Sequence, residues 1–237
     1  MNAMIDRHHL DDATLVSYSA GALPAALALV AAAHIALCPQ CRARLACVDR
    51  LGGMLMHAGP DWRQVPAPAP NPLRGRDAML ARLDALEGMP LGGAPKPAPA
   101  APSAEAGSPD PDLLPGLLHP HFGTRYSALR WRLVAPGLHR VQANGIHEGQ
   151  LMLLKLAPGM ALPPHGHGGS EMTLVLKGAY NDCFGRYGAG DIADLDEDIE
   201  HQPVAEQGEP CIALAGTDAP LRFKTWGARL VQRLVGI

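Results

Sequence analysis

The distribution of proline divides this 237-residue chain into three parts. The two ends can form domains, whereas the proline-rich part between them cannot pack compactly over its whole length. Thirteen of the chain's 23 prolines fall between Pro60 and Pro115. That span is also rich in alanine, so it lacks the large apolar side chains from which a core is built. The total length suits two modest domains. We therefore expect a first domain at residues 1–88, a linker at 89–112 and a second domain at 113–237.

The first domain has the periodicity of helices. Its apolar residues recur every three or four positions, which places them on one face of each helix. Asp11 and Asp12 are typical helix-start residues, and Gly21 is a typical stop. The expected helices run from Asp12 to Gly21, from about Pro24 to Leu37, from Pro39 through Leu55, and through Met79, Leu80, Leu83 and Leu86 to a stop at Gly88. We predict a four-helix domain.

The second domain changes to a period of two. Short apolar runs are separated by Gly and Pro turns, as is typical of strands, at Leu151–Leu156, Met172–Leu176 and Cys211–Ala215. Eight of the ten aromatic residues also lie beyond residue 110. These features predict a small all-β domain, either a barrel or a double-sheet jelly roll.

The charge balance argues against direct binding of nucleic acid. Residues 1–88 carry eight Arg, no Lys and eight acidic side chains, and residues 113–237 carry eleven basic and twelve acidic side chains. Neither domain has the dense positive field that phosphate binding requires. A DNA-binding regulator is therefore disfavoured.

Two features of the chain indicate a cytoplasmic protein. The apolar stretch Ala22–Leu37 is too short to span a bilayer, and it follows Asp6, Asp11 and Asp12 where an export signal would have basic residues. We expect a buried helix there and no membrane contact. The five cysteines are an odd number, and two of them lie close together beside a histidine. This pattern favours metal binding in a reduced compartment over a disulfide framework.

A first metal site is predicted where the second helix ends. His34 and Cys38 are four residues apart, so they lie on one face of the helix, and Cys41 follows through a tight reversal. Zinc prefers four nitrogen or sulfur ligands in a tetrahedron, so a fourth must come from elsewhere. The candidates are His8 and His9, just before the first helix. Ordinary burial is expected for the remaining cysteines, which are Cys47, Cys183 and Cys211.

A second metal site is predicted in the β domain. His165 and His167 alternate in a strand, so both project to the same side, and Glu171 begins the next strand. His201 follows at the interval by which a neighbouring strand delivers a third imidazole. Three histidines and one glutamate are typical ligands of a transition metal such as zinc, iron, manganese or nickel.

These motifs resemble two known families. An upstream histidine followed by His34, Cys38 and Cys41 is similar to the zinc-binding anti-sigma domains. The second set, with glycines at the turns on both sides, resembles the two sequence motifs of the cupins. Both resemblances in this order, together with HGGSEMTLVLKG at 167–178 and TDAPLRF at 217–223, identify the chain as similar to the ChrR-type anti-sigma factors.

The resemblance implies a function and one more ligand. By this likeness His9 is the upstream zinc ligand, and residues 1–88 bind an extracytoplasmic-function sigma factor and keep it from core RNA polymerase. The cupin, holding zinc or another transition metal, would be needed for a response to singlet oxygen or organic hydroperoxides. No catalytic residue is implied. The rival hypothesis is a cupin metalloenzyme, a dioxygenase or isomerase, regulated by the helical domain.

Overall fold

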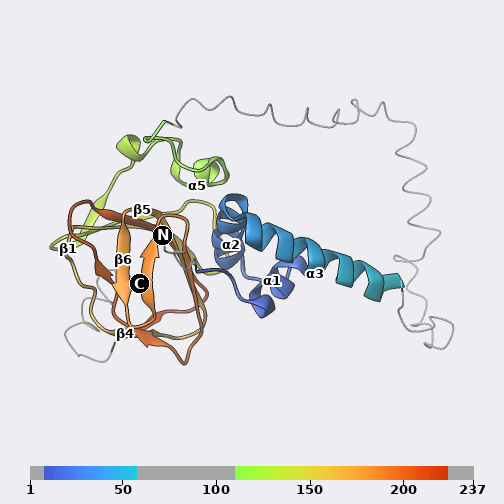
Figure 1. Ribbon diagram of the computed structural model, residues 1–237. Helices are drawn as coiled ribbons and strands as arrows, with labels where there is room; N and C mark the ends of the chain where they lie inside the picture. Colours follow the sequence, from blue (N-terminus) through green and yellow to red (C-terminus); the bar gives the residue numbers. More distant parts are fainter. Residues whose placement is uncertain (1–7, 58–109, 224–237) are drawn as a thin grey trace, which may run out of the picture. The chain divides into compact units, whose positions relative to one another are not determined.

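The computed structural model describes residues 8–57 and 110–223 (Figure 1). Its first part holds three helices, α1 (Asp12–Ser19), α2 (Ala25–Leu37) and α3 (Pro39–His57). These match the first three predicted helices. The fourth, expected through Met79–Leu86, lies outside the described residues, as does most of the predicted linker. The division at 1–88, 89–112 and 113–237 therefore stays a prediction.

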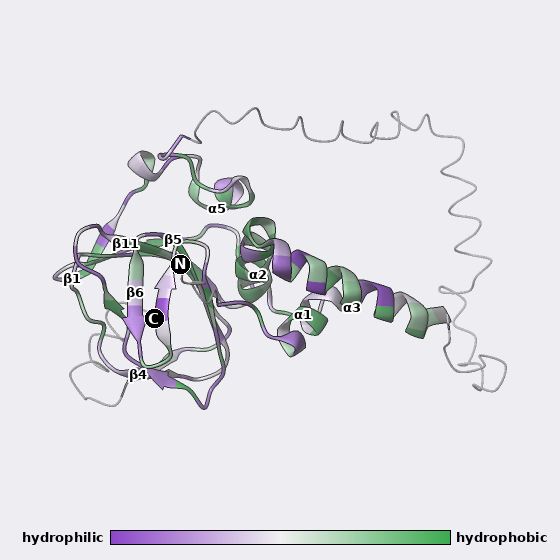
Figure 2. Cartoon of the chain, viewed as in Figure 1, coloured by the Kyte–Doolittle hydropathy of each residue, from purple (hydrophilic) through white to green (hydrophobic). Residues whose placement is uncertain are grey.

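Local hydrogen bonds fix the start of α1 and the turn between α2 and α3. The Asp11 carboxylate accepts a hydrogen bond from the Thr14 amide at 2.6 Å and so caps α1. Apart from His34, helix α2 carries only apolar side chains, and Figure 2 shows it mostly in the hydrophobic colour; seven of its thirteen residues are buried. A helix of that kind needs cover on more than one side. Arg42, in the first turn of α3, donates to the carbonyls of Ile35 and Ala36 and so fixes the reversal between α2 and α3.

The second part is built from antiparallel strands. They are β1 (Arg132–Ala135), β2 (Leu138–Gln142), β3 (Gln150–Leu156), β4 (His165–His167), β5 (Glu171–Lys177), β6 (Ala179–Asp182), β7 (Gly185–Gly188), β8 (Ile192–Leu195), β9 (Glu200–His201), β10 (Val204–Ala205), β11 (Cys211–Thr217) and β12 (Leu221–Phe223). Before them lie the short helices η2 (Gly116–Leu118), α5 (His119–Phe122) and η3 (Tyr126–Ala128). The predicted all-β domain is confirmed.

The strands form one large sheet and two small ones. The six-stranded sheet has the order β1-β2-β3-β11-β5-β8, and the small sheets have the orders β10-β6-β7 and β12-β4-β9. Apolar side chains from the large sheet, such as Val175 and Leu195, pack with Tyr180, Tyr187 and Ala205 of the sheet that contains β6. This inner core confirms a double-sheet arrangement.

The outer face of the large sheet is covered by the helical layer. Helix α2 contacts β11, β5 and β3, and a single apolar cluster joins α2 to residues such as Leu151 and Leu214. The described residues up to Gly52 and those from Asp112 belong to one compact unit. The cover that α2 needs thus comes from the β domain.

Glycine makes the closest part of this packing possible. A Cβ atom at Gly216 of β11 would lie 2.8 Å from Cγ2 of Val30 and 2.9 Å from the carbonyl oxygen of Ala26. No real side chain tolerates such distances, so Gly216 lets the α2 backbone approach the sheet.

Among the described residues, no single helix is long and apolar enough to cross a membrane. Helices α2 and α3 taken together are long and apolar enough to cross a membrane, but the chain bends by 115° between them.

Candidate metal centres

The first predicted site is assembled from the ends of the three helices. His34 lies in the last turn of α2, Cys38 ends that helix, Cys41 lies in the first turn of α3, and His9 precedes α1. Nε2 of His34 is 3.3 Å from Sγ of Cys41, and Nδ1 of His9 is 3.3 Å from Sγ of Cys38 and 3.7 Å from Sγ of Cys41. All four donor atoms lie within 4.8 Å of one another.

These spacings fit a tetrahedral zinc ion. With zinc–sulfur bonds of about 2.3 Å and zinc–nitrogen bonds of about 2.0 Å, neighbouring sulfur and nitrogen ligands lie about 3.5 Å apart. The three sulfur–nitrogen distances lie on either side of that value. Two thiolates and two imidazoles are also the donor set of many structural zinc sites. The geometry therefore suits the metal that the sequence predicts.

The surroundings of the thiols favour a cation between them. The Cys41 amide donates to Sγ of Cys38 at 3.4 Å. Burial raises the pKa of the Cys41 thiol, and the neighbouring Cys38 raises it further, whereas a hydrogen bond from the backbone at Leu10 lowers it. Two buried thiolates side by side are unfavourable unless a positive charge lies between them, and a bound metal supplies that charge.

The structure separates the two candidates for the upstream ligand. His9 points at both cysteines. The ring of His8 instead stacks on Tyr187 of β7, with centroids 3.9 Å apart. His9 is thus the histidine that the fold brings to the site.

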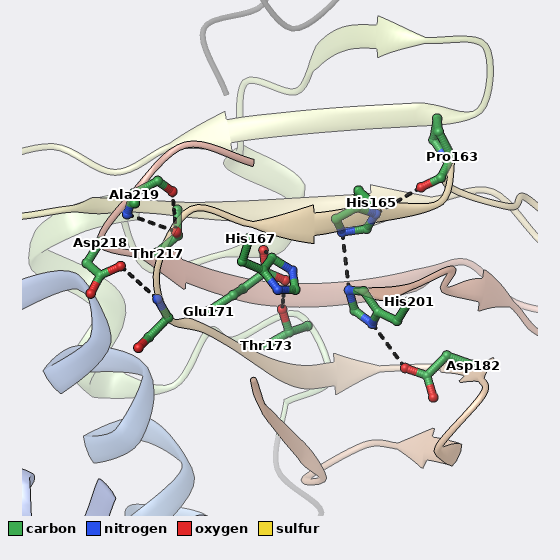
Figure 3. A network of polar contacts seen from close by, with 11 residues as sticks. Pro163, His165, His167, Glu171, Thr173, Asp182, His201, Thr217, Asp218 and Ala219 are labelled. Atoms are coloured by element: carbon green, nitrogen blue, oxygen red, sulfur yellow. Dashed lines mark hydrogen bonds and ion pairs between the residues drawn. The ribbon is translucent and has the colours of Figure 1, made fainter. Parts of the chain in front are cut away.

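The second site lies between β4, β5 and β9 of the β domain (Figure 3). His165 pairs in register with His201 across β4 and β9, which brings their Nε2 atoms to 3.2 Å. Nε2 of His167 lies 3.4 Å from Oε2 of Glu171, whose other oxygen accepts a hydrogen bond from Thr173 at 3.1 Å. All four predicted residues are buried, and their donor atoms lie within 4.8 Å of one another.

In two of these rings the proton lies on Nδ1, so the two Nε2 atoms that face each other can both bind a cation. His165 donates from Nδ1 to the Pro163 carbonyl at 2.9 Å, and His201 donates from Nδ1 to the Asp182 carboxylate at 3.1 Å. In neutral rings both Nε2 atoms then carry lone pairs, which repel each other at 3.2 Å unless a cation accepts both. Burial lowers the pKa of His165 and favours this neutral form. Within the described residues, neither ring nitrogen of His167 makes a hydrogen bond.

The remaining cysteines only partly match their prediction. Cys211 is buried inside the β domain, as expected, and burial raises its pKa to about 12. Cys47 and Cys183 are exposed, so the prediction of burial was wrong for both. Cys47 occupies an exposed position of α3, and Cys183 lies in the exposed turn between β6 and β7.

Two groups that orient the ligands were not predicted. Asp182 lies 19 residues before His201 in the sequence, and the Gly190 carbonyl contacts Nδ1 of His34 at 3.0 Å across 156 residues. Only the sheet register and the packing of α2 bring these groups close.

Comparison with known proteins extends these observations over almost the whole chain. Residues 119–219 match the model of the ChrR cupin-like domain. The chain is 40% identical to the anti-sigma-E factor ChrR of Cereibacter sphaeroides over 229 residues, which are 97% of this chain and 98% of that protein. It is also similar to the crystal structure of Rhodobacter sphaeroides SigE in complex with the anti-sigma ChrR, with 37% identity and a TM-score of 0.64, covering 90% of this chain and 99% of that chain. Since the likeness spans the helical layer and the β domain, and since both ligand sets are present, this chain belongs to the ChrR family of anti-sigma factors.

Proposed function

We propose that this protein is a zinc-dependent anti-sigma factor that binds an extracytoplasmic-function sigma factor and blocks its access to core RNA polymerase. The observation that carries the proposal is the likeness, over 90% of the chain, to an anti-sigma factor crystallised with its sigma factor. The relationship favours this regulatory role over a cupin metalloenzyme. Because core RNA polymerase works in the cytoplasm, the function places the chain there.

The helical layer offers a surface for such a partner. Six large apolar side chains of the three helices are exposed, and we call them the apolar helix surface: Val16, Leu37, Leu51, Met54, Leu55 and Met56. Leu51 and Leu55 are one helical turn apart on α3, so they present a continuous stripe to solvent. An exposed apolar stripe on an amphipathic helix is typical of a surface that packs against another protein.

The metals have different tasks in this proposal. At the first site, His9, His34, Cys38 and Cys41 would hold zinc, which ties the start of α1 to the ends of α2 and α3. The ion supplies folding free energy to these helices, because its ligands come together only in the folded chain. The sigma-binding surface therefore depends on this site.

At the second site, His165, His167, Glu171 and His201 would hold zinc or another transition metal, which would supply a Lewis-acidic centre inside the β domain. Three imidazoles and one carboxylate suit either a four-coordinate metal with no free position or a metal of higher coordination number with an open position. We propose that this centre is needed to respond to singlet oxygen or organic hydroperoxides, as the family resemblance implies. Inhibition of the sigma factor should not require it.

Co-expression tests the proposal directly. The full chain is produced with each candidate sigma factor from the same genome, purified by a tag on the sigma factor, and added to transcription reactions with core RNA polymerase. One sigma factor should co-purify and lose activity. Replacing both Leu51 and Leu55 by Asp should abolish this retention, whereas Leu133→Asp on β1 should not, although Leu133 is 68% exposed and Leu51 is 55% exposed. Failure of every sigma factor to bind would contradict the proposed function.

A further inference from the structure

The first metal site depends on a contact that comes from outside the helical layer. His34 is 1% exposed, and its two ring nitrogens face different partners. Nε2 faces Sγ of Cys41 at 3.3 Å, whereas Nδ1 lies 3.0 Å from the carbonyl oxygen of Gly190 in the β domain. A carbonyl can only accept a hydrogen bond, so the proton of the neutral ring is on Nδ1 and the lone pair of Nε2 points at the cysteines.

The β domain holds the Gly190 carbonyl rigidly. Gly190 lies in the turn between β7 and β8 with a φ of 92°, a conformation that suits glycine. Its amide donates to the Val175 carbonyl at 2.9 Å, and the Val175 amide donates to the Asp191 carbonyl at 3.0 Å. The buried Asp191 carboxylate accepts from the Gly188 amide at 2.8 Å. The turn is thereby fixed to β5, the strand that begins with Glu171 of the second site.

The same region of the β domain contacts the segment that carries His9. The Ile192 amide faces the His8 carbonyl at 3.4 Å, and the His8 ring stacks on Tyr187. Tyr187 stacks in turn on Tyr180, with centroids 4.8 Å apart. Thus β7, β8 and their turn adjoin both histidines of the first site. They contact the ring of His34 directly, and they contact His9 through its neighbour His8.

We infer that the backbone carbonyl of Gly190 is a positioning group of the first metal site, through which the β domain controls how firmly the helical layer retains its metal. The partner of the second nitrogen of a ligand histidine fixes the ring and increases its basicity, and loss of such partners commonly weakens metal binding 10- to 100-fold. The inference rests on the proposed ligation of metal by His34. It adds that the two domains share one metal site.

Substitution at Gly190 tests the inference. An added methyl group at Gly190 would meet no atom within 4 Å, so Gly190→Ala acts only by straining a positive φ and displacing the carbonyl. Gly208→Ala is a matched control, because Gly208 has a φ of 107°, equally open surroundings and a place in the turn before β11, away from both sites. The two variants differ in which carbonyl they move.

Cobalt makes the measurement specific to the first site. Only a cysteine-containing centre gives a thiolate-to-cobalt charge-transfer band, so decay of this band after addition of a chelator reports metal loss from Cys38 and Cys41 in the full chain. We expect about tenfold faster loss in Gly190→Ala, and a rate in Gly208→Ala equal to that of the unaltered chain. If the band forms and all three rates are equal, the inference is wrong although the metal proposal stands. Absence of the band in the unaltered chain would overturn both.

A second measurement needs no variant. Long-range proton–nitrogen NMR spectra of the zinc-loaded chain distinguish a protonated from a metal-bound imidazole nitrogen. A proton on Nδ1 of His34 and metal on Nε2 would support the inference even if Gly190→Ala did not fold. The opposite assignment would overturn it.

Discussion

Asp182 accepts a hydrogen bond from Nδ1 of His201 across 3.1 Å, and the two side chains are 0% and 1% exposed (Figure 3). Asp182 is the last residue of β6, in a small sheet different from the one that contains His201. A buried carboxylate in this position fixes the tautomer of the imidazole and increases the basicity of the opposite nitrogen. Asp182 would thus act on the proposed metal site through His201 without being a ligand.

Asp182→Asn should weaken metal binding in the β domain, because the amide keeps the shape of the carboxylate and loses its charge. We expect about a tenfold lower affinity, measured as metal content after dialysis against a graded series of chelator concentrations. Inhibition of the sigma factor should be unchanged. Asp198→Asn is the control, since Asp198 is exposed on the loop before His201. Equal metal content in both variants would contradict the role of Asp182.

Replacing Cys38 and Cys41 together by Ala should abolish sigma binding. Structural zinc contributes on the order of 10 kcal/mol to folding in small zinc domains, and the thin helical layer depends on it. The double variant should lose one equivalent of metal, part of its helical circular dichroism and its retention of the sigma factor. Cys47→Ala should change none of these, because Cys47 is exposed and lies outside the site. Full inhibition by the double variant would disprove the zinc-dependent surface.

The sequence carried enough information for both ligand sets because each is largely local. Cys38 and Cys41 are close in sequence, and His165 and His167 alternate within one strand. Glu171 and His201 follow at intervals that depend on strand and turn lengths, and glycines mark those turns. Spacing therefore predicted the convergence of seven of the eight side chains, whereas the choice of His9 over His8 came from the family resemblance.

The contacts between the domains could not be predicted in this way. Helix α2 is apolar on every side, so its sequence showed that it is buried but did not show what covers it. The close approach of α2 to the sheet depends on Gly216, because the absence of a side chain there leaves space for Val30. A glycine within a strand does not show by itself which segment packs against it. The Gly190 carbonyl was equally hidden, since a backbone atom leaves no trace in a pattern of side chains.

Gly216→Ala should loosen the packing of α2 on the sheet. The new methyl group would lie 2.8 Å from Cγ2 of Val30, and overpacking of this kind costs about 1–3 kcal/mol. Urea unfolding should show this decrease in the free energy of unfolding. Gly116→Ala is the matched control, because its methyl group meets nothing within 4 Å and its φ is not positive. If both variants unfold at the same urea concentration, α2 does not pack on Gly216 in solution.

Asp194 should make the contact between α1 and β8 sensitive to pH. Burial raises the pKa of Asp194 above its ordinary value of 3.8, although hydrogen bonds from the Thr14 side chain and the Asp11 amide partly oppose the shift. Between 3.8 and the raised pKa the unfolded chain binds fewer protons than the folded one, so this carboxyl's contribution to stability is complete below that window and is lost as pH rises through it. Asp194→Asn removes this loss. The variant's stability relative to the unaltered chain should therefore rise with pH through the window and then level off, in urea unfolding curves recorded at successive pH values. Any release of metal at low pH affects both chains and cancels in the difference. A difference that stays flat, as expected for Asp196→Asn at an exposed position, would contradict the raised pKa.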